Sequence, residues 1–185
     1  MLIFRGILSF GYERVLTDKS TLMANFGLTH RDFIYEIWGN NQLDLLDRTT
    51  KSSIGYFLDL SYKFYPNDFD DFNALYFSPG IAYKKYNLKA IDQYGKGSSI
   101  SQELNVGYTM TEGYIKIGYM YEAFLFDDVT VDAYFGFGYR SINQNTYEEI
   151  PSADLNNSRQ YTLQPKTITI NVPAIYLGTR IGIGF

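Results

Sequence analysis

Apolar and polar residues alternate along most of this chain with a period of two. Read backwards from Phe185 in segment 167–185, the odd positions as far as Ile175 are apolar or neutral, whereas the even positions from 184 to 178 are glycine or arginine. Side chains of a β-strand point alternately to opposite faces, so this period predicts a strand with one apolar and one polar face. Comparable patterns predict further strands over residues 7–16, 20–29, 53–65, 75–86, 100–124 and 129–140.

The connections between these strands differ in length. Short turns are expected at 17–19, 66–73 and 126–128, and long segments at 30–52, 87–99 and 141–166. Within 100–124 the apolar positions are even before Thr111 and odd after Gly113, which indicates either a hairpin or a β-bulge. A bulge puts every long segment at one end, as in outer-membrane barrels. We therefore predict a bulge in one strand of about 25 residues, roughly 80 Å long.

The polar faces of the predicted strands carry charges of both signs, interleaved with glycine. A lipid-facing Lys or Arg costs about 2–4 kcal/mol near the bilayer midplane, so we assign this face to a barrel lumen. Charges of both signs predict a packed interior without an open channel, since eight strands leave just enough room for side chains. The predicted lumen charge network comprises Arg5, Glu13, Asp59, Lys63, Lys84, Lys116, Glu122, Asp132, Arg140 and Arg180.

The strand count favours a transmembrane antiparallel β-barrel with tall external hairpins, forming a single domain over residues 1–185. The bulge interpretation leaves seven full strands, whereas bacterial barrels normally have an even number. Residues 1–4 are therefore expected to be the end of a truncated first strand, with a turn at Arg5 and Gly6, in an eight-stranded barrel. Proline lacks an amide donor, so Pro79 is expected near the periplasmic rim and Pro173 above the outer leaflet.

Composition supports this fold class and excludes several functions. The chain has 185 residues, with 18 Tyr, 14 Phe and one Trp, and such aromatic content suits membrane interfaces. A net charge of −4 without a basic block disfavours nucleic acid, and the absence of cysteine excludes disulfides and thiol catalysis. Arg5 follows Met1 too closely for a secretion signal, so we expect a non-native start or missing upstream sequence. A soluble, tyrosine-rich β-sandwich or lipocalin-like barrel is the alternative.

Two features resemble known outer-membrane proteins. The terminal Phe185 resembles the C-terminal aromatic signal by which Gram-negative outer-membrane barrels are recognised and inserted. Residues 6–20, GILSFGYERVLTDKS, resemble the opening of small outer-membrane barrel proteins of Bacteroidota, and residues 131–140, VDAYFGFGYR, resemble the penultimate strand of that family. The resemblance implies a barrel in the outer membrane; members mostly lack an assigned activity, so it implies no catalytic residue.

Candidate chemistry is sparse. The single histidine, His30, precedes Asp32 by two residues, and a rim enzyme would also need a serine such as Ser52, Ser53 or Ser98 within hydrogen-bond reach. A lone interfacial histidine is more often a polar rim residue. The run 67–71, NDFDD, has calcium-like oxygen spacing but neither the central glycine nor the closing glutamate, so a solvated turn is favoured.

These observations predict a non-enzymatic outer-membrane barrel with a packed polar lumen. It would act as a structural or accessory subunit, or bind through its external loops and strand edges. The expected partners are outer-membrane lipid and a larger outer-membrane protein complex, with no nucleic acid, cofactor or metal. The alternatives are a small pore and a rim enzyme using His30.

Overall fold

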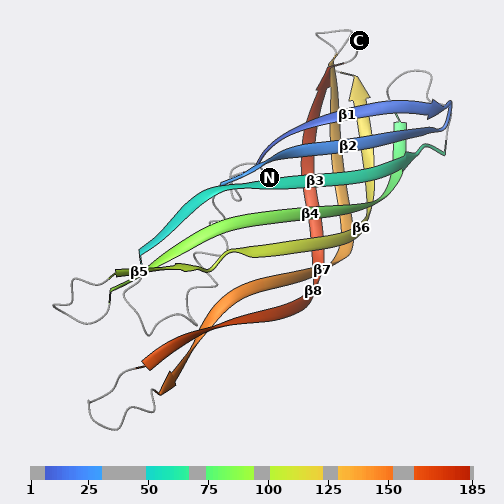
Figure 1. The fold of residues 1–185 in the computed structure, drawn as a ribbon. Coiled ribbons are helices and arrows are strands. Elements are labelled where there is room, and N and C mark those ends of the chain that lie inside the picture. The colour runs from blue at the N-terminus through green and yellow to red at the C-terminus, as the bar shows by residue number, and fades with distance from the viewer. Residues whose placement is uncertain are drawn as a thin grey trace.

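The computed structural model describes residues 7–30, 49–66, 74–93, 101–122, 129–151 and 161–183. These residues form a single antiparallel sheet, so the predicted all-β antiparallel architecture is confirmed (Figure 1). The strands are β1 (Ile7–Thr17), β2 (Ser20–Thr29), β3 (Thr49–Phe64), β4 (Ala74–Gln93), β5 (Ser101–Asn105), β6 (Tyr108–Glu122), β7 (Val129–Pro151) and β8 (Tyr161–Ile183).

The sheet follows chain order and curls strongly on itself. Its path is β1-β2-β3-β4-β6-β7-β8, with β5 pairing with β4, and in Figure 1 β1 and β2 cross in front of β7 and β8. The Arg180 guanidinium of β8 lies 2.6 Å from the Met23 sulfur of β2. The Lys63 ammonium of β3 lies 3.4 Å from a carboxylate oxygen of Asp132 in β7. The curled sheet therefore has an interior face, where distant strands meet, and an outward face.

Within the described residues, the outer edges of the first and last strands carry no ladder. Among the described residues no ladder joins β1 to β8, so these residues do not form the closed eight-stranded barrel that the sequence predicted. Every pairing along the seven-strand path is antiparallel, so β1 and β8, the first and last strands of that path, run in the same direction. The predicted strand at residues 1–4 lies outside the described residues.

The short connections lie together at one end of the sheet. The turn between Thr17 and Ser20 adjoins the end of β3, since Ser20 pairs with Phe64. The registers of the following pairs bring the end of β6 and the end of β8, at Ile183, to the same level. We call this end the turn rim and the opposite end the hairpin end. The long hairpins extend to the lower left in Figure 1, at the hairpin end.

The predicted bulge at residues 111–113 is wrong, and no hairpin occurs there either. The ladders from β6 to β4 and to β7 pass through Glu112 without a register shift. Even positions face the interior on both sides of this point, from Leu104 to Met120. The apparent change of frame is a change of chemistry, because the interior is apolar toward the hairpin end and charged toward the turn rim. β5 and β6 keep one register against β4, so they act as one long, interrupted strand.

The hairpins are taller than the sequence indicated. Residues 141–151 were expected in a loop but extend β7, and β8 begins at Tyr161 instead of position 167. The 23 residues of β7 span roughly 76 Å when extended. The sequence pattern did not predict this extension, because its outward positions are polar. Asn143 and Asn145 of β7 face outward there and pair with Thr169 and Thr167 of β8.

Pro79, expected near the rim, is the sixth residue of β4, five residues from the turn-rim end of the strand at Ala74. It pairs with Ile115 of β6, whereas the ladder to β3 runs from Ser61–Gly80 directly to Phe64–Phe77 and omits it. The side of the proline that lacks a donor therefore coincides with a local gap in the β3–β4 ladder. Within the described part of the chain, no helix is both long and apolar enough to cross a membrane.

Candidate functional site in the charged interior

Tyrosine rings cover glycine backbones on the interior face. Gly80 pairs with Tyr114 and Gly118 pairs with Tyr76 across the β4–β6 ladder. A Cβ atom added at Gly80 would lie 2.5 Å from the Tyr114 ring, and one at Gly118 would lie 2.2 Å from the Tyr76 ring. No larger residue fits at these glycines while the rings keep their positions, so alternating glycine and tyrosine sets the packing of the interior.

A buried ammonium group lies between two carboxylates near the turn rim. Lys63 is 1% exposed; its Nζ lies 2.9 Å from Glu13 Oε2 of β1 and 3.4 Å from Asp132 Oδ2 of β7. The Tyr76 hydroxyl donates to Asp132 Oδ1 at 2.5 Å, and the Tyr65 hydroxyl donates to Glu13 Oε1 at 3.3 Å. Because a buried charge is costly without partners, this cluster ties strands β1, β3, β4 and β7 together.

A second buried lysine occupies an aromatic cage in the middle of the interior. The Lys116 ammonium lies 3.7 Å from the ring centroid of Tyr114, 4.9 Å from that of Tyr134 and 5.7 Å from that of Tyr176. Its carboxylate partner, Asp59 Oδ2, is 4.0 Å away, and Asp59 also accepts a hydrogen bond from the Tyr114 hydroxyl. Cation–π attraction and the carboxylate together stabilise the charge in this position.

A carboxylate between two cations forms the third cluster, toward the hairpin end. Glu112 is 1% exposed; its Oε2 accepts from Lys84 Nζ at 2.6 Å and its Oε1 accepts from Arg140 Nε at 2.5 Å. These contacts join β4, β6 and β7 through charge-assisted hydrogen bonds, which are shorter and stronger than neutral ones.

Beyond the third cluster, the interior becomes apolar. The rings of Tyr86 and Tyr108 stack at 4.7 Å with an interplanar angle of 21°. Ile142 and Tyr147 of β7 pack against this group. The apolar interior cluster consists of Tyr86, Leu88, Leu104, Val106, Tyr108 and Met110. Side chains thus fill the interior at successive levels, charged toward the turn rim and apolar toward the hairpin end.

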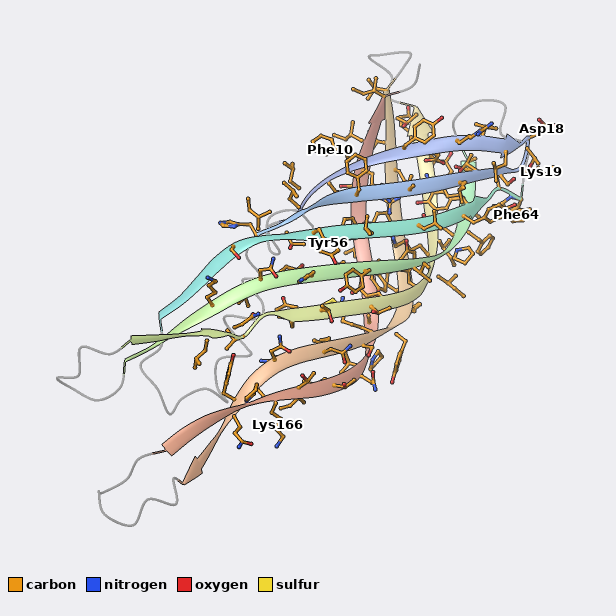
Figure 2. All side chains as sticks on the ribbon, in the orientation of Figure 1. Phe10, Asp18, Lys19, Tyr56, Phe64 and Lys166 are labelled. Carbon is orange, nitrogen blue, oxygen red and sulfur yellow. The ribbon has the colours of Figure 1, made fainter. Side chains whose placement is uncertain are left out.

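The outward face carries a continuous set of exposed apolar side chains, which we call the apolar belt (Figure 2). Exposure of these side chains reaches 77% at Ile181 and 61% at Phe10. Arg14 also faces outward, near the turn rim. The belt comprises Leu8, Phe10, Tyr12, Leu22, Phe26, Leu28, Ile54, Tyr56, Leu58, Leu60, Tyr62, Phe64, Leu75, Phe77, Ile81, Ile115, Ile117, Tyr119, Tyr121, Val131, Phe135, Phe137, Tyr139, Ile175, Leu177, Ile181 and Ile183.

The structure brings most of the predicted lumen charges together. The paired members are Glu13, Asp59, Lys63, Lys84, Lys116, Asp132 and Arg140, and the Arg180 guanidinium lies over the Tyr134 ring at 4.9 Å. Arg5 and Phe185 lie outside the described residues, as does the side chain of Glu122. Sequence reasoning missed Glu112, although extending the even frame of Lys116 and Gly118 backwards places it on the same face.

The residues considered for rim catalysis are only partly described. His30 is exposed at the end of β2, while Asp32 and Ser98 lie outside the described residues, as does the side chain of Ser52. The Ser53 hydroxyl donates to the Asn87 carbonyl at 3.4 Å. The acidic run 67–71 also lies outside, and no group of metal-ligating side chains occurs within the described ranges.

Comparison with known proteins adds no relative. No protein family, curated protein or solved structure matches this chain.

Proposed function

We propose that this chain forms the greater part of a non-enzymatic outer-membrane β-barrel and serves as a structural or accessory subunit. The observation that carries the proposal is the inverted polarity of the curled sheet. Lys63, Glu112 and Lys116 are buried in the interior, while large apolar side chains cover the outward face. In water the exposed apolar surface would carry a free-energy cost of roughly 25 cal/mol per Å². In a bilayer the same surface contacts acyl chains instead of water.

The dimensions of the belt suit a bilayer. Along β3 it runs from Ile54 to Phe64, roughly 33 Å of extended strand. With the tilt of about 40° usual in membrane barrels, that length gives a height of about 25 Å, the usual height of the apolar band. Arg14 lies within three residues of Thr17 at the turn rim, from which a long side chain reaches head groups.

The packed interior favours a structural role over a pore. Side chains of opposite sign meet across the sheet in all three charged clusters, and tyrosine rings fill the space between them. A conducting lumen needs continuous water, which these contacts oppose. The described residues therefore support a scaffold or a partner-binding subunit.

Within the described residues, the outer edges of β1 and β8 carry no ladder, which is compatible with an accessory role. Because β1 and β8 run in the same direction, antiparallel closure requires one further strand that runs the opposite way. A second copy in the same membrane orientation presents edges that run in the same direction again, so it cannot supply this strand. A β-strand from outside the described residues, whether of this chain or of a partner, would cover both edges and complete the sheet.

Purification from outer membranes in mild detergent tests the proposal. The chain has no cysteine, so Ser9→Cys on β1 and Thr179→Cys on β8 provide unique attachment points for a photo-crosslinker at the two edges. We expect one additional polypeptide to co-purify and to crosslink from both positions, while Asn143→Cys on the outward side of β7 remains uncrosslinked. A lone, monodisperse chain would contradict the accessory role.

A further inference from the structure

A neutral polar patch lies on the outward face at the hairpin end, where β6, β7 and β8 continue beyond the apolar belt (Figure 1). Its members are threonine, serine or asparagine, and strand register arranges them in rows across the sheet. The rows are Thr111–Ser141–Asn171, Thr109–Asn143–Thr169 and Asn145–Thr167. We call these residues the hydroxyl–amide array. The cation next to it in register, Lys85, pairs with Thr109, but its ammonium lies toward β3, 5.9 Å from the Tyr56 ring centroid.

Hydrogen bonds within the array orient its two exposed asparagine side chains. The Thr169 hydroxyl donates to Asn143 Oδ1 at 2.7 Å, and the Thr167 hydroxyl donates to Asn145 Oδ1 at 3.5 Å. Each asparagine still has its amide NH₂ group as a donor, and each threonine oxygen still has lone pairs as acceptors. These exposed positions repeat about every 6.7 Å along each strand. The array therefore presents donors and acceptors together, in regular positions and without a charge of its own.

An exposed aromatic ring lies where the array meets the apolar belt. Tyr139 is 57% exposed and pairs with Gly113 of β6 and Pro173 of β8. A Cβ atom added at Gly113 would meet nothing within 4 Å, so open space lies over the backbone beside Tyr139. A tyrosine ring offers an apolar face for packing and a hydroxyl for hydrogen bonding. A flat ligand can therefore pack against this ring while its polar edge reaches the array.

We propose that the hydroxyl–amide array and Tyr139 bind the uncharged sugar head group of a glycolipid in the same membrane. This inference rests on the proposed function, because it needs the belt to lie in a bilayer. Sugar hydroxyls both donate and accept hydrogen bonds, as amide and hydroxyl side chains do, and the C–H face of a sugar ring packs on an aromatic ring. Continuity with the belt favours a lipid-linked sugar over a free one, because Phe137 and Ile175 pair directly on the turn-rim side of Tyr139 and would contact the acyl chains.

The test measures lipid retention by the full chain reconstituted in phosphatidylcholine vesicles. The probe is spin-labelled digalactosyl diacylglycerol, and diacylglycerol with the same acyl chains and label serves as the reference. We expect the wild-type chain to retain the glycolipid preferentially. Loss of one hydrogen bond lowers an association constant about fivefold, so the double variant Asn143→Ala and Asn145→Ala should retain the glycolipid no better than the reference. Tyr139→Leu, which keeps the position apolar but removes the ring, should also weaken the preference.

The matched controls make the same kinds of change elsewhere on the outward face. Phe135→Leu removes an exposed ring within the belt, and Thr179→Ala removes an exposed hydroxyl that pairs with Ala133 nearer the turn rim. Both variants should keep the wild-type preference. Equal retention by the double variant and the wild type, or no preference in the wild type, would overturn the sugar site.

Protease protection in the vesicles separates this inference from the proposed function. An unprotected chain contradicts the membrane role itself, whereas a protected chain without preference contradicts the sugar site alone. Free galactobiose provides a further arm. If it binds the chain as tightly as the glycolipid does, the array is a site for soluble sugars and the assignment to a membrane lipid is overturned.

Discussion

Replacing Glu112 by Gln is the perturbation whose effect the structure defines most sharply. The substitution preserves the shape of the side chain but removes the charge between Lys84 and Arg140, whose side chains are 10% and 14% exposed. Two charge-assisted hydrogen bonds weaken, each worth about 1.5–3 kcal/mol. Two buried cations then face each other across a neutral amide, and breaking a buried ion pair usually costs about 3–5 kcal/mol. We expect the free energy of unfolding to fall by about 3–5 kcal/mol.

Urea unfolding in detergent micelles, followed by far-UV circular dichroism, measures this change. The control is Thr111→Ala, since Thr111 is adjacent to Glu112 but exposed on the outward face, and its effect should stay within about 0.5 kcal/mol. Adding Lys84→Met to Glu112→Gln removes one of the two facing cations and should recover part of the loss. If Glu112→Gln destabilises no more than Thr111→Ala, the ion cluster does not hold the interior together and the reasoning is refuted.

Further substitutions test the packing and the two faces of the sheet. Gly80→Ala should destabilise by about 1–3 kcal/mol because the new methyl displaces a tyrosine ring, whereas Gly113→Ala, which meets nothing within 4 Å, should be nearly neutral by the same urea titration. Tyr76→Phe removes a hydrogen bond to a carboxylate and should cost about 1.5–3 kcal/mol; an unchanged unfolding midpoint would contradict that contact. Leu60→Arg should weaken folding into vesicles by about 2–4 kcal/mol, while Asn143→Arg, beyond the belt, should fold normally. Planar-bilayer recordings should show no stable conductance, and discrete channel openings would contradict the packed interior.

Alternation of residues predicted the strand segments that carry the apolar belt and assigned their two faces. In β3, for example, Leu58 and Leu60 face outward while Asp59 and Lys63 face inward, as the period of two requires. Alternation gave a wrong prediction near Glu112, because the inward face was identified by its polarity. The register shows that the even positions face inward on both sides of Glu112. An interior that is apolar at one level and charged at another reverses the polar pattern without any shift of the backbone.

The sequence pattern did not predict the contacts between distant strands. Nothing in the spacing of Lys63 and Asp132 indicates that their side chains meet, because the curl of the sheet, and not the local period, determines which strands face each other. The tyrosine cage of Lys116 has the same origin, since Tyr134 and Tyr176 lie 18 and 60 residues after it in the chain. Strand directions also emerged only from the complete ladder, which revealed that β1 and β8 run the same way.

The central claim, that the apolar belt faces lipid, is tested most directly by quenching of a fluorescent label at single introduced cysteines. The native chain has no cysteine, so Leu60→Cys reports on the belt and Asn143→Cys on the polar face beyond it. In vesicles, the label at position 60 should be quenched by brominated acyl chains and protected from aqueous iodide, and the label at position 143 should show the reverse. Equal quenching of both labels by iodide would contradict the membrane account.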